Sequence, residues 1–283
     1  MIKIIESPRE GMQGFSRIIP TVEKVEYINQ LLRVGFNAVE IGSMVSPKII
    51  PQMADSLEVL KKLDLSGTTS DRMFLTGNRK GAEIVAGLDE ITHISYPFSI
   101  SPAFLKLNLN STVEQSLETA GMVVNLCEKN GKQAVIYIPM AFGNPYNDPW
   151  SIGLLVEWVS KLYEAGARII PLSNVSMEID AALITEVYST LIPLFPDIEF
   201  GLHLHTANHD WHSKVNAAYM AGCTRFDGVI HGWGGCPMAG KEMLGNLKTE
   251  NLIKFAEIMN LPVNIDKIAL DKAFKVAENI FSE

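Results

Sequence analysis

Two histidines one residue apart, His203 and His205, are the strongest candidates for chemistry in this sequence of 283 residues. They end an apolar segment, 198–204, that reads as a β-strand, and alternate residues of a strand face the same side. Both imidazoles can therefore contact one metal ion. A pair of hydrogen-bonded core histidines is the alternative, and for an isolated His-x-His it is the commoner explanation. We favour the metal because acids and an asparagine stand at comparable positions elsewhere in the chain.

The expected ligand set narrows the choice of metal. Imidazole nitrogens combined with oxygen ligands suit Mg²⁺, Mn²⁺ or Zn²⁺. The chain has no clustered cysteine pair, which argues against a closed structural zinc site. We therefore expect a divalent cation, with Mg²⁺ or Mn²⁺ preferred and Zn²⁺ left open.

Two glutamates are further candidates. Glu40 interrupts the apolar run 38–41, and a buried carboxylate needs a partner such as Arg9 or a metal. Glu10 follows the first strand, where a helix cap or a solvated loop residue is the alternative. We favour a functional role for Glu40, because its strand is otherwise apolar.

The three cysteines have different surroundings. Cys236 lies in the glycine-rich segment 231–237, whereas Cys127 and Cys223 fit packing positions in or beside helices. Only Cys236 therefore has a context that suggests chemistry. Three is an odd number and too few for a disulfide framework, which favours a reducing compartment.

The elements that must position these residues alternate between short apolar strands and longer amphipathic helices. Strands are expected at 2–5, 37–41, 72–76, 90–96, 133–139, 168–172, 198–204 and 225–230. Helices are expected at 21–34, 53–63, 79–86, 111–130, 149–165, 179–191, 211–221, 249–259 and 267–281, with Gly35 ending the first.

Eight strand–helix units in a chain of this length predict a closed (β/α)8 TIM barrel with an additional C-terminal helix, in one catalytic domain spanning 1–283. An open doubly wound sheet would favour a G-x-G-x-x-G motif opening its first helix, and residues 10–15 are not one. The polar candidates lie at or after the carboxyl ends of the expected strands, at the barrel end where such enzymes carry their chemistry.

Composition excludes several classes of protein. The net charge is −8, with no basic run, so nucleic acid is not an expected partner. No apolar run reaches the length of a membrane span, and the N-terminus does not resemble a signal peptide. We expect a cytoplasmic protein that does not bind membranes. Lys48, Arg79 and Lys106 follow strands and can meet phosphates, although solvated charge is the alternative.

Several segments resemble the metal-dependent lyases and Claisen-type synthases built on a TIM barrel, and among them the 3-hydroxy-3-methylglutaryl-CoA lyases. The similarity covers nearly the whole chain. It is carried by the segment 39–53, by the glycine-rich segments 234–237 and 245–247, and by Gly-Asn-Pro-Tyr at 143–146.

The resemblance implies a set of site residues. The metal ligands would be Glu10, His203, His205 and Asn246. The catalytic residues would be Arg9, Glu40 and Cys236. The substrate-binding residues would be Gln13, Ser173, Asn174 and Lys48.

The implied reaction is retro-Claisen cleavage of a 3-hydroxyacyl-CoA, such as 3-hydroxy-3-methylglutaryl-CoA, to acetyl-CoA and acetoacetate. The implied partner is a small acyl-CoA or hydroxy acid, and a homodimer is one option for the assembly. The family's pattern is altered at three positions. Glu10 replaces an aspartate, and Ser173 and Thr206 stand where the family has acids. Two other functions stay open: an aldolase or Claisen-type synthase acting on a 2-oxo acid, and a catalytically degenerate barrel used for binding.

Overall fold

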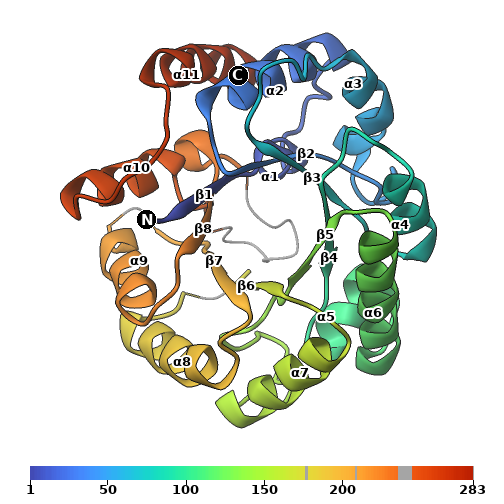
Figure 1. The fold of residues 1–283 in the computed structure, drawn as a ribbon, viewed down its shortest axis with the longest axis vertical. Helices are drawn as coiled ribbons and strands as arrows, with labels where there is room; N and C mark the ends of the chain where they lie inside the picture. The colour runs from blue at the N-terminus through green and yellow to red at the C-terminus, as the bar shows by residue number, and fades with distance from the viewer. Residues whose placement is uncertain (176–177, 208, 235–243, 283) are drawn as a thin grey trace.

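Eight parallel strands close on themselves in sequence order, from β1 next to β2 round to β8 next to β1 (Figure 1). The computed structural model describes residues 1–175, 178–207, 209–234 and 244–282. The strands are β1 (Lys3–Glu6), β2 (Ala38–Ser43), β3 (Asp71–Leu75), β4 (His93–Pro97), β5 (Gln133–Tyr137), β6 (Ile169–Ser173), β7 (Glu199–His203) and β8 (Arg225–Gly228). The predicted TIM barrel is confirmed.

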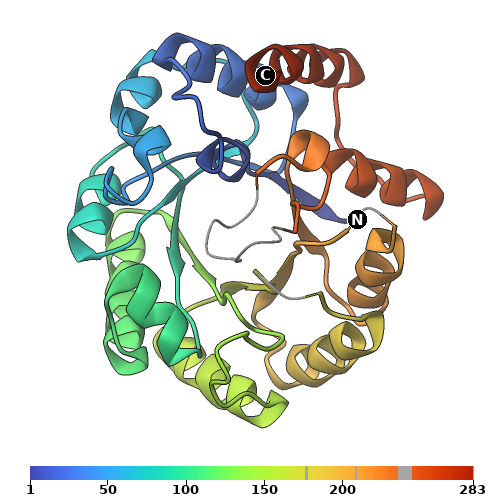
Figure 2. The same ribbon diagram turned by 180° about the vertical axis from the view of Figure 1, so that it is seen from behind.

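Helices surround the barrel on its outside, as both ribbon views show (Figures 1 and 2). The longer helices are α2 (Thr21–Val34), α4 (Arg79–Ala86), α6 (Val113–Lys129), α7 (Ile152–Glu164), α8 (Ala181–Leu194), α9 (Trp211–Met220), α10 (Thr249–Ile258) and α11 (Lys267–Phe281). Shorter ones are α1 (Pro8–Gln13), η1 (Pro51–Met53), α3 (Ser56–Lys62), α5 (Pro102–Leu109) and η2 (Ile230–Gly232).

The apolar core lies in two shells, because each strand has an inner and an outer face. A large cluster fills the layer between strands and helices. A small cluster inside the barrel contains Ile5, Ala38, Met73 and Val135, with Tyr137 packed against it. The interior is therefore filled with side chains below the site rather than open as a pore.

The predicted additional helix at the C-terminus, α11, packs on α2, its neighbour at the rim of the barrel (Figure 1). The rings of Tyr27 and Phe281 meet edge to face with centroids 5.9 Å apart. Gly35 ends α2 with a left-handed φ of 89°, as the sequence predicts. A side chain there would be strained and would press on the Asn264 carbonyl.

Two helices were missed in the sequence, α1 and α5, and both follow strands at the catalytic end. Each begins with a proline, Pro8 or Pro102, whose fixed φ favours the first helical turn. Ser101 also caps α5 by accepting a hydrogen bond from the Phe104 amide. The segment after β1 is therefore a helix and not the expected loop, because one turn is too short to show a helical apolar period.

Within the residues that the structure describes, no helix combines the length and the apolar character needed to cross a bilayer.

Candidate functional site

A cavity of about 200 Å³ lies at the carboxyl ends of the strands, and most of the predicted site residues line it. Its polar side is formed by Arg9, Glu10, Gln13, Glu40, Tyr137, Ser173, His203 and His205. Its apolar side is formed mainly by Val45, Ile49, Ile50, Leu75, Pro97, Phe104, Leu109, Pro139 and Val175. The cavity therefore offers a concentrated set of charges facing a hydrocarbon wall.

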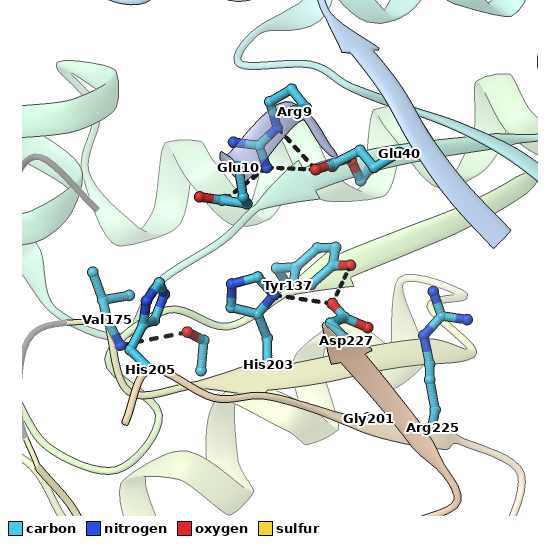
Figure 3. A network of polar contacts seen from close by, with 12 residues as sticks. Arg9, Glu10, Glu40, Tyr137, Val175, Gly201, His203, His205, Arg225 and Asp227 are labelled. Carbon is cyan, nitrogen blue, oxygen red and sulfur yellow. Dashed lines mark hydrogen bonds and ion pairs between the residues drawn. The ribbon is translucent and has the colours of Figure 1, made fainter. Parts of the chain in front are cut away.

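Arg9 joins two carboxylates on the α1 side of the cavity (Figure 3). Its Nη2 lies 2.6 Å from Glu40 Oε2 and 2.7 Å from Glu10 Oε1, and its Nε donates to Glu40 Oε2 at 2.8 Å. Its Nη1 donates to Gln13 Oε1 at 2.7 Å. The expected partner of the buried Glu40 is thus Arg9. The guanidinium is held in one orientation by α1 and β2 together.

The two carboxylates on Arg9 have opposite pKa shifts. Burial acts to raise the pKa of Glu10, but Arg9 and the two histidines outweigh it and lower the pKa to about 2. Burial, with the charge of Glu10, raises the pKa of Glu40 above its ordinary value although Arg9 opposes this. Glu10 is therefore the more strongly ionised acid, and Glu40 is the stronger base.

His203 is held through its ring. Its Nδ1 lies 3.0 Å from Asp227 Oδ2, and the Tyr137 hydroxyl donates to the same oxygen at 2.6 Å (Figure 3). Burial lowers the pKa of His203, but Asp227, Glu10 and Glu40 outweigh it, so the pKa is raised overall. Asp227 was not among the residues singled out in the sequence. The signal that could have found it is a charged residue inside a buried strand, as at Glu40.

His205 is held through its backbone. The side-chain amide of Asn174 donates to the His205 carbonyl at 2.7 Å and accepts from the His205 amide at 2.8 Å. Burial and the neighbouring His203 lower the pKa of His205 to about 3, so the ring is neutral. The two imidazole centroids are 5.1 Å apart, as expected for side chains that face the same way.

Asn246 pairs with His205 as an isolated antiparallel bridge. Its amide donates to the Trp233 carbonyl at 2.7 Å. Asn246 Oδ1 and His205 Nδ1 are buried with no hydrogen-bond partner among the described residues. Two acceptor-type atoms are thus left unsatisfied beside the cavity.

The remaining predicted residues lie in different places. Ser173 is buried and lines the cavity, whereas Lys48 is exposed and does not. The Asn174 side chain contacts the His205 backbone and is absent from the cavity wall, which differs from the expected substrate contact. Cys236 lies outside the described residues.

Among the residues that the structure describes, no group of three or more His, Cys, Asp or Glu side chains is arranged to hold a metal ion. One Glu10 oxygen is turned onto Arg9, and the fourth expected ligand, Asn246, is an amide and not one of those four residue types.

Comparison with known proteins places the chain in a family. The family model described as HMGL-like matches residues 2–277. The chain belongs to the HMGL-like family. Among curated proteins, it is 30% identical to the hydroxymethylglutaryl-CoA lyase YngG of Bacillus subtilis, over 96% of this chain and 90% of that protein.

Two further relatives extend the comparison of this HMGL-like chain. It is 27% identical to an (R)-citramalyl-CoA lyase of Chloroflexus aurantiacus, over 93% of this chain and 86% of that protein. It superposes with a TM-score of 0.89 on an HMG-CoA lyase of Acinetobacter baumannii in complex with coenzyme A and 3-methylmalate. That match is 27% identical and covers 99% of this chain and 91% of the other. The resemblance seen in the sequence is confirmed at the level of the family.

Proposed function

We propose that this chain is a divalent-metal-dependent carbon–carbon lyase that cleaves a 3-hydroxyacyl-CoA, such as 3-hydroxy-3-methylglutaryl-CoA, to acetyl-CoA and acetoacetate. The observation that carries the proposal is one cavity in which Arg9, paired with Glu10 and Glu40, faces the pair His203 and His205. Relatives named as lyases of CoA esters support it, as does the coenzyme A bound in a related structure.

The residues present fit a divalent cation. His205 Nδ1 and Asn246 Oδ1 are buried without a partner among the described residues, and such atoms are costly unless something satisfies them. Glu10 is ionised because its pKa is about 2, and His203 uses only Nδ1 on Asp227. Glu10, His203, His205 and Asn246 would hold the ion. When bound, a divalent cation supplies positive charge that lowers the pKa of a substrate hydroxyl.

The two carboxylates divide the proton chemistry between them. Cleavage begins with loss of the substrate's 3-hydroxyl proton, and we assign Glu40 as its acceptor because its raised pKa makes it the stronger base. Glu10 has the lowered pKa and stays ionised throughout. Opposite pKa shifts thus give two glutamates on one arginine two different roles.

Arg9 stabilises the charge that forms next. As the bond between C2 and C3 breaks, its electron pair moves onto the thioester carbonyl and gives an enolate, while C3 becomes the ketone carbon of acetoacetate. The charges of Glu10 and Glu40 outweigh the effect of burial and raise the pKa of Arg9. It therefore stays charged and offers fixed donors to the enolate oxygen. Protonation of the enolate carbon completes acetyl-CoA, and a part for Cys236 in the reaction remains a prediction from the resemblance.

The apolar wall of the cavity would take the hydrocarbon part of the acyl group. Phe104, Leu109 and Ile49 lie on that wall, and water excluded from it cannot weaken the charges opposite. Lys48 adjoins Ile49 in the loop after β2 and is exposed, so we assign it to the phosphates of coenzyme A at the mouth. Gln13 and Ser173 remain the proposed polar contacts of the acyl group.

We further propose that residues 1–283 form a single catalytic domain that works in the cytoplasm. Cys127 and Cys223 are buried free thiols, which agrees with a reducing compartment.

The test is a direct assay of the purified protein with Mg²⁺ or Mn²⁺. We expect release of acetyl-CoA and acetoacetate from 3-hydroxy-3-methylglutaryl-CoA, with kcat lowered about 10²- to 10³-fold in Arg9→Met. The matched control is Arg33→Met, because Arg33 is exposed in the last turn of α2 and is not among the residues that line the cavity. Citramalyl-CoA, which would give acetyl-CoA and pyruvate, and hydroxy-oxo acids serve as competing substrates. A folded, metal-loaded protein that cleaves none of the CoA esters would refute the proposal.

A further inference from the structure

We propose that Asp227 and Arg225, a buried charge pair inside the barrel, fix the imidazole of His203, with Asp227 as the positioning residue and Arg225 acting through it. The topology places them together. Residues 225 and 227 of β8 are two apart and so face the same side, toward the barrel interior. In the pairing of β7 with β8, His203 stands beside Asp227 and Gly201 beside Arg225.

Asp227 connects three strands at one oxygen. Its Oδ2 lies 3.0 Å from His203 Nδ1 on β7 and accepts from the Tyr137 hydroxyl of β5 at 2.6 Å. Asp227 is 2% exposed. Burial and the charge of Asp227 raise the pKa of Tyr137 well above its ordinary value. The phenol therefore keeps its proton and remains a donor to Asp227.

Arg225 is the first residue of β8, two residues before Asp227 and so farther from the carboxyl ends of the strands, and it is 3% exposed. Its Nη1 donates to Glu199 Oε1 at 3.2 Å, while Nε and Nη2 have no hydrogen-bond partner among the described residues. The missing side chain of Gly201 makes room for it, since a Cβ there would stand 3.0 Å from Arg225 Cδ. The Arg225 side chain is thus buried inside the barrel below the site (Figure 3).

A buried carboxylate group is costly without a nearby positive charge or hydrogen-bond donors. Asp227 Oδ1 has no hydrogen-bond partner among the described residues. The field of Arg225 supplies compensation, and in return Asp227 and Glu199 raise the pKa of Arg225 against the effect of burial. The barrel interior at this level therefore contains two buried opposite charges that interact through their fields.

The consequence is a fixed tautomer of His203. Asp227 Oδ2 already accepts from the Tyr137 hydroxyl, so we assign it as the acceptor for His203 Nδ1 as well, which places the lone pair of the neutral ring on Nε2. Partners of this kind hold metal-binding histidines in the productive orientation. Arg225 stands two residues away from Asp227 and is not among the residues that line the cavity, so we assign its effect on His203 to the charge of Asp227.

Asp227→Asn tests the role of Asp227, because it keeps the shape and removes the charge. The first readout is the ¹⁵N NMR tautomer signature of His203 in the metal-free protein, which does not depend on activity. We expect the Nδ1–H form to lose its dominance, and Mn²⁺ affinity by calorimetry to fall about 10- to 100-fold. An unchanged tautomer with Mn²⁺ affinity within twofold of the parent would overturn the proposal.

Arg225→Met tests whether Arg225 acts on His203 through Asp227. It leaves both hydrogen bonds of Asp227 in place, so this test remains available even if Asp227→Asn does not fold. We expect Mn²⁺ affinity to fall severalfold. Glu199→Gln is the control, since it removes the other charge on Arg225 and leaves the pair with Asp227 intact. Equal affinities in Arg225→Met and Glu199→Gln would remove Arg225 from the proposal. The Mn²⁺ readouts rest on the metal dependence in the proposed function, whereas the tautomer readout does not, so a parent protein that binds no Mn²⁺ leaves the tautomer test valid.

Discussion

The two histidines of the site stand in contrasting surroundings. On the His203 side, Arg9, Glu10, Glu40 and Asp227 form a network of buried charges. On the His205 side, the partners are the neutral amides of Asn174 and Asn246 and the nearby backbone. We call these the charged half and the neutral half of the site.

The contrast separates two ways of positioning a side chain. In the charged half, opposite charges hold each other and contribute to the pKa shifts of Arg9, Glu10 and Glu40, so removing one member leaves another buried and uncompensated. In the neutral half, hydrogen bonds fix the backbone, and His205 Nδ1 and Asn246 Oδ1 have no hydrogen-bond partner in the described part of the chain. Substitutions in the charged half should therefore alter stability and protonation, whereas those in the neutral half should alter mainly geometry.

The largest expected effect is that of Arg9→Met on stability. The variant leaves Glu40, which is 2% exposed, without its positive partner. We expect the free energy of unfolding in urea to fall by about 3–5 kcal/mol, against less than about 0.5 kcal/mol for the exposed control Arg79→Met. Adding Glu40→Gln to Arg9→Met should restore part of the loss. A loss no larger than that of the control would show that the charged half is not held by ion pairing.

The next effect concerns an acid just outside the charged half. Glu6 is fully buried, and its side chain accepts hydrogen bonds from the Ile230 amide and the Thr249 hydroxyl. Burial, with a contribution from Glu250, raises its pKa from 4.5 to about 8. Glu10, four residues later and beside Arg9, has a pKa of about 2. The pKa values of Glu6 and Glu10 differ because Arg9 and the two histidines stand beside Glu10.

The sign of the pH dependence follows from that shift. Because the folded pKa of Glu6 exceeds the unfolded value, its contribution to stability is complete below pH 4.5 and is lost as the pH rises through about 8. Glu6→Gln should flatten the fall in unfolding free energy across this range by up to about 1.4 kcal/mol per pH unit. The exposed Glu114→Gln should leave the profile unchanged. Identical profiles for parent and Glu6→Gln would contradict the assignment.

The smallest expected effect is that of Asn174→Asp in the neutral half. The carboxylate cannot donate to the His205 carbonyl, so one of the two backbone hydrogen bonds is replaced by repulsion. We expect Mn²⁺ affinity by calorimetry to weaken about tenfold, and hydrogen exchange at the His205 amide to become faster. Asn125→Asp, on an exposed face of α6, is the matched control. Unchanged affinity and exchange would mean that Asn174 does not position His205.

Much of the fold could be predicted from the sequence. The helices at 21–34 and 267–281 agree with α2 and α11 residue for residue, because long amphipathic segments repeat their period several times. The short helices α1 and α5 were missed because they contain too few residues to show a repeated apolar period. The last strand was expected to extend to residue 230, but β8 ends at Gly228, where the apolar run continues into η2.

The site was predicted in part. The residues expected to meet were Arg9, Glu10, Glu40, His203 and His205. Each lies near or just after the carboxyl end of a strand, and the cavity does bring them together. The contacts of Asn174, Asp227 and Arg225 could not be foreseen. Each depends on which neighbouring strand faces it and in what register, and this is a property of the closed barrel.

By itself, the sequence determined the alternation of strands and helices, the end of the barrel that carries the chemistry, and the types of side chain gathered there. These follow from local periodicity and from the rule that parallel strands point the same way. Only the tertiary structure decided which charge each side chain feels. Glu6, Glu10 and Glu40 are the same residue type in β1, α1 and β2, yet their pKa values differ, because burial dominates at Glu6 and Glu40 whereas Arg9 and the two histidines outweigh it at Glu10.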